Sequence, residues 1–189
     1  MELLKKKSFI LGAIVLVLGL LGSFYWWNGR VHDALYPYNP KKDRASLVQI
    51  FSQNWYFLDD RELNEGLKSF EEWLDKVDDP VLAARPDAME WTVYRSDDGI
   101  ARAFISYYMK QPDEKIGKIL YLAVNEQYRK QGIARKLMTK AIDALIKKGA
   151  KVIEIVTRIT NYPAQNLYKS LGFVQVGADE TFVFLELRP

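Results

Sequence analysis

Residues 129–134 read Arg-Lys-Gln-Gly-Ile-Ala, and this stretch decides how the rest of the chain is interpreted. It follows the apolar run Ile119-Leu-Tyr-Leu-Ala-Val124, which is typical of a buried strand. It leads into a pattern over 132–148 in which apolar residues recur at helical spacing. The order predicts a strand, a tight turn and the first residues of a helix.

The predicted turn has the features of a phosphate-binding site. A helix N-terminus carries about half a positive charge and several unpaired N–H donors. Gly132 has no Cβ, so the main chain there is able to approach a ligand closely. We expect this turn to hold the pyrophosphate of a nucleotide-like cofactor, although it matches neither the three-glycine dinucleotide fingerprint nor the Walker loop. The groups involved are the N–H groups of Gln131, Gly132, Ala134 and Arg135 and the charges of Arg129, Lys130 and Arg135.

A second motif follows a strand predicted over 152–159. It reads Asn161-Tyr-Pro-Ala164-Gln-Asn-Leu-Tyr168-Lys-Ser-Leu-Gly172-Phe173, which predicts a short helix closed by Gly172. With both motifs in place, the chain resembles the GNAT superfamily of acetyl-CoA-dependent N-acetyltransferases, over roughly Asp43 to Pro189. The family pattern Arg/Gln-x-x-Gly-x-Gly/Ala after a strand ending in Val is met by Val124, Arg129, Gly132 and Ala134. The pattern Asn-x-x-Ala-x-x-x-Tyr-x-x-x-Gly-Phe is met by Asn161, Ala164, Tyr168, Gly172 and Phe173.

The resemblance implies a reaction and a set of donor-binding residues. An acetyl group would move from acetyl-CoA to a primary amine, of a small molecule or a protein, by direct attack in a ternary complex. The strand that ends at Val124 would pair with the pantetheine arm through free main-chain groups. The implied acetyl-CoA-binding residues are Leu122, Ala123, Val124, Arg129, Lys130, Gln131, Gly132, Ile133, Ala134, Arg135 and Asn161.

The resemblance also implies two catalytic groups. The main-chain N–H of Val124 would stabilise the oxyanion that forms at the thioester carbonyl. Tyr168 would act as the general acid that protonates the departing thiolate. Two carboxylates, Glu126 and Glu154, are candidates for the general base. Four side chains on predicted strands are candidates to line the acceptor pocket, with a place in the core as the equal alternative for the aromatic ones: Trp91, Tyr94, Ser106 and Tyr108.

Two other functions stay open at this stage. The domain would be an acyl-CoA-binding or interaction module without turnover if it kept the fold and lost catalysis. Alternatively, it would be an envelope anchor protein whose domain serves only contact. One scaffold serves many substrates, so the fold alone does not define the acceptor.

Composition excludes several other classes of protein. The 189 residues carry a formal net charge of only +3, which argues against a nucleic-acid binder with a broad basic face. No cysteine is present, so disulfides, thiolate nucleophiles and Cys-ligated zinc are excluded. The single histidine, His32, lies outside the predicted domain. We therefore expect no metal and no Ser-His-Asp triad.

The N-terminal segment has the pattern of a membrane anchor. Residues 1–7 form a basic flank, and residues 8–27 are apolar and uncharged, long enough to cross a bilayer as a helix. The aromatic residues at 25–27 are typical of an interfacial belt, and they stand where a signal peptide would need small residues for cleavage. We expect a retained single-pass transmembrane helix, with a cleaved signal peptide as the alternative.

The side of the membrane that carries the domain stays open. The lysines at 5–7 favour a cytoplasmic N-terminus, but basic residues also follow the span. A domain that uses acetyl-CoA is expected in the cytosol, which conflicts with the lysine signal.

The remaining pattern predicts an α/β fold with a mixed sheet. The resemblance implies that this central sheet is mostly antiparallel and flanked by helices. Residues 28–42 contain two prolines and predict a linker, and 43–189 form the acetyltransferase domain. Two helices are expected first, one over 44–58 capped by Asp43 or Ser46, and one that opens on a capping box at Asp59 and Glu62 and ends at Asp79-Pro80. The other expected elements are strands at 90–95, 100–109, 118–124 and 152–159, helices at 132–148 and 161–171, and a closing hairpin at 173–176 and 181–187.

Overall fold

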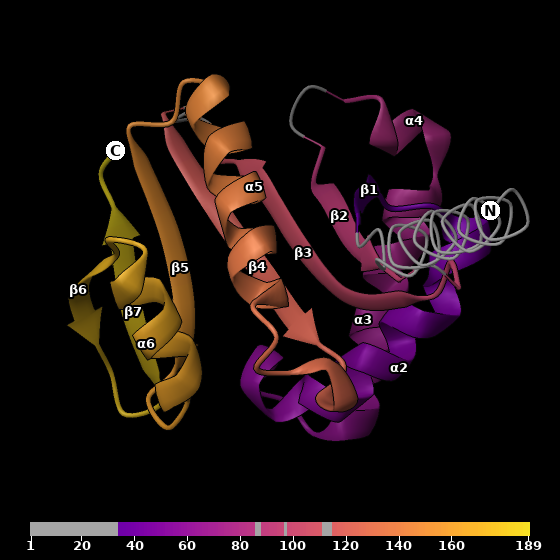
Figure 1. Cartoon of the computed structure of the whole chain (residues 1–189), viewed down its shortest axis with the longest axis horizontal. Helices are drawn as coiled ribbons and strands as arrows, with labels where there is room; N and C mark the ends of the chain where they lie inside the picture. The colour runs from indigo at the N-terminus through magenta and orange to yellow at the C-terminus, as the bar shows by residue number, and fades with distance from the viewer. Residues whose placement is uncertain (1–33, 86–87, 97, 111–114) are drawn as a thin grey trace, which may run out of the picture. The chain divides into compact units, whose positions relative to one another are not determined.

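A seven-stranded sheet carries the domain in the computed structural model, which describes residues 34–85, 88–96, 98–110 and 115–189. The strand order is β1-β2-β3-β4-β5-β7-β6 (Figure 1). All neighbouring strands are antiparallel except β4 and β5, which run parallel. The prediction of a mixed, mostly antiparallel sheet is therefore confirmed. The strands are β1 (Ala34–Pro37), β2 (Glu90–Arg95), β3 (Ala101–Met109), β4 (Ile116–Val124), β5 (Val152–Arg158), β6 (Val174–Ala178) and β7 (Phe182–Leu187).

Helices cover both faces of this sheet. The helices α2 (Pro40–Leu58) and α3 (Leu63–Asp78) pack on one face of β2, β3 and β4. The helix α5 (Ile133–Lys147) packs on the opposite face, and α6 (Tyr162–Ser170) contributes to the same core as α5 (Figure 1). Two short helices complete the described residues, α4 (Pro80–Ala83) and the 3-10 turn η1 (Glu126–Tyr128).

The two cores differ in chemistry. The core under α2 and α3 is aromatic, with Phe51 stacked on Phe70 at 4.2 Å and Tyr121 meeting both rings edge-on. The core under α5 and α6 is mainly aliphatic. The apolar stripes predicted for the first two helices are confirmed as core, because Leu47, Phe51, Phe70 and Leu74 are fully buried.

The prediction of a linker in front of the domain is wrong in part. The sequence predicts a linker over 28–42, but Ala34–Pro37 pair with β2 and α2 already begins at Pro40. The helix is capped by Asn39, whose side chain accepts a hydrogen bond from the N–H of Lys42, rather than by Asp43 or Ser46. Asp43 is instead buried inside the helix, where it pairs with Arg95 at the end of β2. This contact crosses 52 residues of sequence, so local pattern did not reveal it.

The capping box predicted at Asp59 and Glu62 is also wrong. Glu62 precedes α3 without a side-chain cap, and the Asp59 carboxylate accepts two hydrogen bonds from the guanidinium of Arg61. The predicted end of the helix at Asp79-Pro80 is confirmed. From Glu90 onward, the predicted ends of helices and strands differ from the observed ones by at most two residues.

The predicted flank at 1–7, the predicted span at 8–27 and His32 lie outside the described residues. Among the helices that are described, none combines the length and the apolar character that crossing a bilayer requires.

Candidate active site

The strand β4 is paired on both sides over only part of its length. Its residues Ile116–Ile119 pair with Val152–Ile155 of β5, and we call them the closed half of β4. Beyond Ile119 the parallel ladder stops, while β5 continues to Arg158 in its ladder with β7. Residues 120–124, which we call the open half, stay paired with β3 alone. The lower ends of β4 and β5 accordingly lie apart in Figure 1.

A β-bulge marks the point where the ladder with β5 ends. The register between β3 and β4 shifts because Tyr107 pairs with Ile119 and Ser106 pairs with Tyr121, which leaves Leu120 as the extra residue. The buried hydroxyl of Ser106 accepts the N–H of Tyr121 at 3.1 Å. Leu120 and Tyr121 consequently both pack toward the aromatic core, although neighbouring residues of a regular strand alternate. The bulge thus bends β4 away from β5.

The register also determines which main-chain groups face away from β3. Asn125 donates its N–H to the carbonyl of Arg102, and in an antiparallel ladder the residues that exchange such bonds alternate along the strand. Ala123 therefore directs its N–H and C=O toward β3, whereas Leu122 and Val124 direct theirs toward the β5 side. The expectation that all three residues offer free main-chain groups is corrected for Ala123.

The turn before α5 contains two residues with left-handed backbone. Lys130 has a φ of 62° and Gly132 a φ of 78°. Lys130 is the one described residue other than glycine with positive φ, a conformation that costs about 1–2 kcal/mol. An ideal Cβ added at Gly132 would have no atom within 4 Å, so open space lies beside the turn.

The first turn of α5 keeps N–H groups that the helix itself leaves unpaired. The first helical hydrogen bond runs from the N–H of Lys136 to the carbonyl of Gly132. The N–H groups of Ile133, Ala134 and Arg135 therefore have no helical partner, and Gly132 has no side chain to cap them. Lys130 and Gln131 are exposed beside these groups. This arrangement suits an anion at the predicted position.

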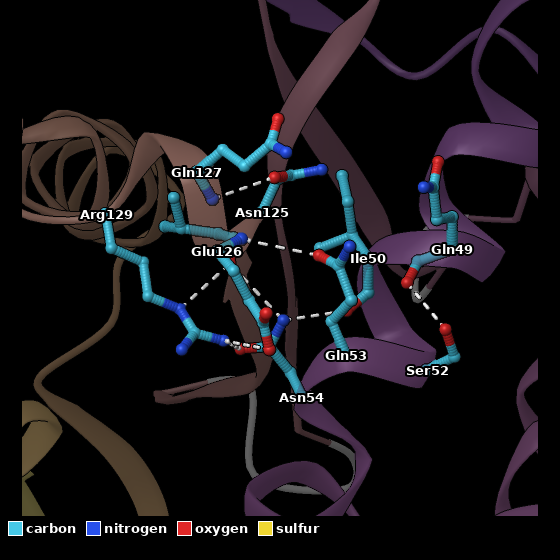
Figure 2. A network of polar contacts seen from close by, with 10 residues as sticks. Gln49, Ile50, Ser52, Gln53, Asn54, Asn125, Glu126, Gln127 and Arg129 are labelled. Carbon is cyan, nitrogen blue, oxygen red and sulfur yellow. Dashed lines mark hydrogen bonds and ion pairs between the residues drawn. The ribbon is translucent and has the colours of Figure 1, made fainter.

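The two arginines predicted beside the turn are engaged within the protein. Arg135 donates to the hydroxyl of Ser170 at the end of α6. Arg129 turns toward β4, where its Nε lies 3.4 Å from the carbonyl oxygen of Val124. Its Nη2 donates to the side chain of Asn54 on α2 at 3.0 Å, as Figure 2 shows. The sequence motif did not reveal Asn54, because 75 residues separate it from Arg129.

Tyr168 belongs to the same core cluster as Ile133, and the side chains of Leu122 and Val124 pack against that cluster. The ring is 5% exposed, and burial raises the pKa of its hydroxyl above the ordinary value. Its hydroxyl makes no hydrogen bond to any residue that the structure describes. The fold therefore gathers the predicted acid, the open half of β4 and the start of α5 around one core.

Asn161 is the N-cap of α6. Its Oδ1 accepts the N–H of Ala164 at 3.4 Å, and its Nδ2 donates to the hydroxyl of Thr157 at 3.0 Å. Thr157 is buried near the end of β5. Asn161 thus fixes the start of the second motif against the strand that leaves β4.

The two candidate bases lie in different places. Glu154 is in the closed part of the sheet, where it pairs with Lys110 and Lys118. Glu126 lies two residues after the open half, is exposed, and lies 3.7 Å from Arg129. The sequence did not point to Asp59 as a site residue. Burial, and then the charge of Asp59, raises the pKa of Tyr121 in the open half to about 12. Hydrogen bonds from Arg61 hold the pKa of Asp59 below its usual range, so Asp59 is a weak base.

The four candidates for an acceptor wall do not share one face of the sheet. Trp91 packs in the aromatic core and Tyr94 in the opposite core. Ser106 is occupied in the bulge, and Tyr108 lies beside the closed half, opposite Lys118. The four residues therefore do not line one pocket, and Trp91 and Tyr94 are core residues, which is the alternative that the sequence left open. The end of α2 and the α2–α3 connection are instead held to the end of β5, where Arg158 donates to the carbonyl of Asp59 at 2.9 Å and also to that of Tyr56.

The described residues contain no group of three or more His, Cys, Asp or Glu side chains placed to hold a metal ion. The site therefore offers main-chain donors, a buried phenol and guanidinium groups for chemistry.

The similarity of this chain to known proteins covers the region that forms the site. The sequence model of the acetyltransferase (GNAT) family matches residues 44–173. The chain is 42% identical over 59 residues to N-alpha-acetyltransferase 30 of Xenopus laevis, which covers 31% of this chain and 22% of that protein. It is 29% identical over 119 residues to mycothiol acetyltransferase of Beutenbergia cavernae, which covers 63% of this chain and 34% of that protein. The chain thus spans about a fifth to a third of the length of these curated relatives.

A solved structure supports the fold. The PaiA N-acetyltransferase of Thermoplasma acidophilum, crystallised in complex with coenzyme A, superposes with a TM-score of 0.68 at 15% identity. The match covers 83% of this chain and 99% of that chain.

Proposed function

The chain belongs to the acetyltransferase (GNAT) family, and from this premise we propose that it transfers an acetyl group from acetyl-CoA to a primary amine by direct attack in a ternary complex. The amine belongs to a small molecule or to a protein. The observation that carries the proposal is the open half of β4 ending beside the uncapped start of α5. One region offers pairing groups for an extended arm and the other offers donors for a phosphate.

The donor is bound mainly by main-chain groups. The N–H groups from Gln131 to Arg135 hold the pyrophosphate, and Gly132 lets it approach. Lys130 supplies an exposed charge beside it. The pantetheine arm pairs with Leu122 and Val124 on the side of β4 that β5 has left, in the manner of an added strand. Asn161 contributes by holding α6 near this site.

Two groups promote the chemistry. The amine nitrogen attacks the thioester carbonyl, and the N–H of Val124 stabilises the charge that develops on the oxygen. As the carbon–sulfur bond breaks, Tyr168 donates its proton to the leaving thiolate. Burial raises the pKa of Tyr168, so the phenol is protonated at neutral pH. The amine loses its proton to water or to the exposed Glu126, since Arg61 holds Asp59 in its charged, weakly basic form.

We also propose that residues 8–27 tether the domain to a membrane as a single-pass helix. The uncharged run and its flanking basic residues support this. Extraction of cell membranes with alkaline carbonate tests it, since an anchored chain stays in the pellet. A chain that is released, or that lacks residues 1–27 by mass spectrometry, would remove the tether.

The enzymatic proposal is tested with the full chain in detergent. Acetyl-CoA is mixed with a panel of small amines and of peptides with free α-amines, and release of coenzyme A thiol is followed. Amine-dependent release supports the enzyme. Binding of coenzyme A without release by any amine would favour a binding module, for which the lack of a carboxylate on β4 is the supporting observation.

A further inference from the structure

We propose that Asn54 of α2 is a positioning residue for acetyl transfer, because it fixes the peptide group that follows Val124. The inference rests on the proposed function, in which the N–H of Val124 faces the thioester oxygen. Asn54 lies on the helix that covers the opposite face of the sheet from α5. It does not touch the reacting atoms and acts through Val124.

The contacts of Asn54 join α2 to the segment from Val124 to Arg129, which begins 70 residues later in the sequence (Figure 2). Its Nδ2 donates to the carbonyl of Ile50 at 2.7 Å and to the carbonyl of Val124 at 3.3 Å. Its Oδ1 accepts from Nη2 of Arg129 at 3.0 Å. The amide thus uses donors on two carbonyls and its acceptor on a guanidinium. Only an amide of this length supplies both kinds of group at this place.

The carbonyl of Val124 needs such a partner. It faces the β5 side, where the ladder has ended, so no strand pairs with it. Asn54 and Arg129 both reach it, at 3.3 and 3.4 Å. With this acceptor covered, the end of β4 presents the N–H of Val124 to a ligand without a competing carbonyl beside it. An N–H donor alone is what a developing oxyanion requires.

A neighbouring contact supports the same role. Gln53, one residue earlier on α2, accepts the N–H of Glu126 through its Oε1 at 3.3 Å. Asn125, between the two held residues, caps η1 by accepting the N–H of Gln127. The segment from Val124 to Glu126 is therefore held to α2 at both ends. An error of about 1 Å in the position of a catalytic group lowers rates by about 100-fold, so this hold has consequences for turnover.

The test uses acetyl-CoA labelled with ¹³C at the thioester carbonyl, bound to the full chain in detergent without any amine. In the wild-type protein, the N–H of Val124 polarises the carbonyl and shifts its resonance from the free value. Asn54→Ala removes all three contacts. Asn54→Asp keeps the volume and the Arg129 contact but puts an acceptor against the Val124 carbonyl. Ser52→Ala is the matched control, because the Ser52 hydroxyl donates to the carbonyl of Gln49 within α2 itself.

We expect both Asn54 variants to lose the carbonyl shift while binding coenzyme A within about twofold of wild type, since the pyrophosphate turn is unchanged. With an amine acceptor, kcat falls about tenfold and KM for acetyl-CoA stays nearly constant. Ser52→Ala behaves as wild type. A wild-type shift retained in Asn54→Ala, or in Asn54→Asp, overturns the positioning role and leaves the proposed function intact. A wild-type chain that does not bind acetyl-CoA overturns both.

Discussion

The closed and the open half of β4 belong to one strand and meet very different surroundings. The closed half lies between β3 and β5, and Gly117 in it packs against the side chain of Leu145 of α5. The open half keeps β3 as its neighbour but has left β5. The closed half completes the sheet, whereas the open half leaves main-chain groups without a strand partner.

This difference shows that the binding surface arises because the ladder between β4 and β5 ends early, and not because β4 carries reactive side chains. Unpaired main-chain groups are costly when buried, so an open half persists only if a ligand, water or a side chain satisfies it. Asn54 and Arg129 satisfy the carbonyl of Val124. The groups of Leu122 and the N–H of Val124 are those that we assign to acetyl-CoA.

The largest effect is expected where the open half meets the turn. Gly132→Leu should lower affinity for coenzyme A about 1,000-fold, because the side chain displaces the phosphate from about two charge-assisted hydrogen bonds. Calorimetry measures the affinity. Gly99→Leu is the matched control, since Gly99 has nearly the same φ of 75° and equally open surroundings, but lies in the connection between β2 and β3 rather than in the turn before α5. It carries the same strain and should bind normally. Equal losses in both variants would refute a site at the turn.

Replacing Tyr168, the predicted general acid, tests the chemistry proposed beside the open half of β4. Tyr168→Phe should lower turnover about 100-fold and leave affinity for coenzyme A almost unchanged. The acid is the protonated phenol, which is present below its pKa, and burial raises that pKa above 10. Wild-type turnover should therefore show no loss from Tyr168 ionisation as the pH rises to about 10. An unchanged rate in Tyr168→Phe at every pH would exclude Tyr168 from the mechanism.

A substitution in the closed half should change the free energy of unfolding and leave coenzyme A binding unchanged. A Cβ at Gly117 would lie 3.0 Å from two carbons of Leu145, so Gly117→Val should overpack this core by about 2 kcal/mol. Urea denaturation measures the change, and the folded variant should bind coenzyme A normally. Gly177→Val on β6 is the control, because its Cβ meets Phe184 at an ordinary 3.5 Å. A loss of affinity in Gly117→Val without loss of stability would contradict the division of β4.

The smallest effect is expected at the junction between the halves. Ser106→Ala removes the acceptor of the Tyr121 N–H and leaves a buried donor unpaired, which should cost about 1 kcal/mol in unfolding free energy. Affinity for coenzyme A should fall only a few fold as the bulge loosens. Ser52→Ala, with its hydroxyl on the carbonyl of Gln49, should change stability by less than about 0.5 kcal/mol. No difference between the two serines would mean that the hydroxyl does not support the bulge.

The sequence was sufficient for features encoded within a few neighbouring residues. The strand–turn–helix around Gly132 and the helix capped by Asn161 depend on backbone conformation and capping, which act within one turn of chain. The apolar stripes of α2 and α3 were equally local, because periodicity alone places Phe51 and Phe70 in the core.

The features that were mispredicted depend on contacts between distant segments. The burial of Asp43 requires Arg95, and the covered carbonyl of Val124 requires Asn54, 70 residues away. The direction of the Ala123 main-chain groups follows from the register with β3, and no local sequence pattern determines that register. The strand β1 exists because β2 offers an edge to it.

Amide hydrogen exchange, read by NMR for the full chain with and without acetyl-CoA, tests the central claim most directly. We predict that acetyl-CoA slows exchange at Leu122, Val124 and the N–H groups of 131–135, while Ala123 and Ile119 keep the rates of the free chain. Protection that appears equally along β4, or binding that leaves Leu122 and Val124 unprotected, would contradict the claim that the open half holds the acetyl donor.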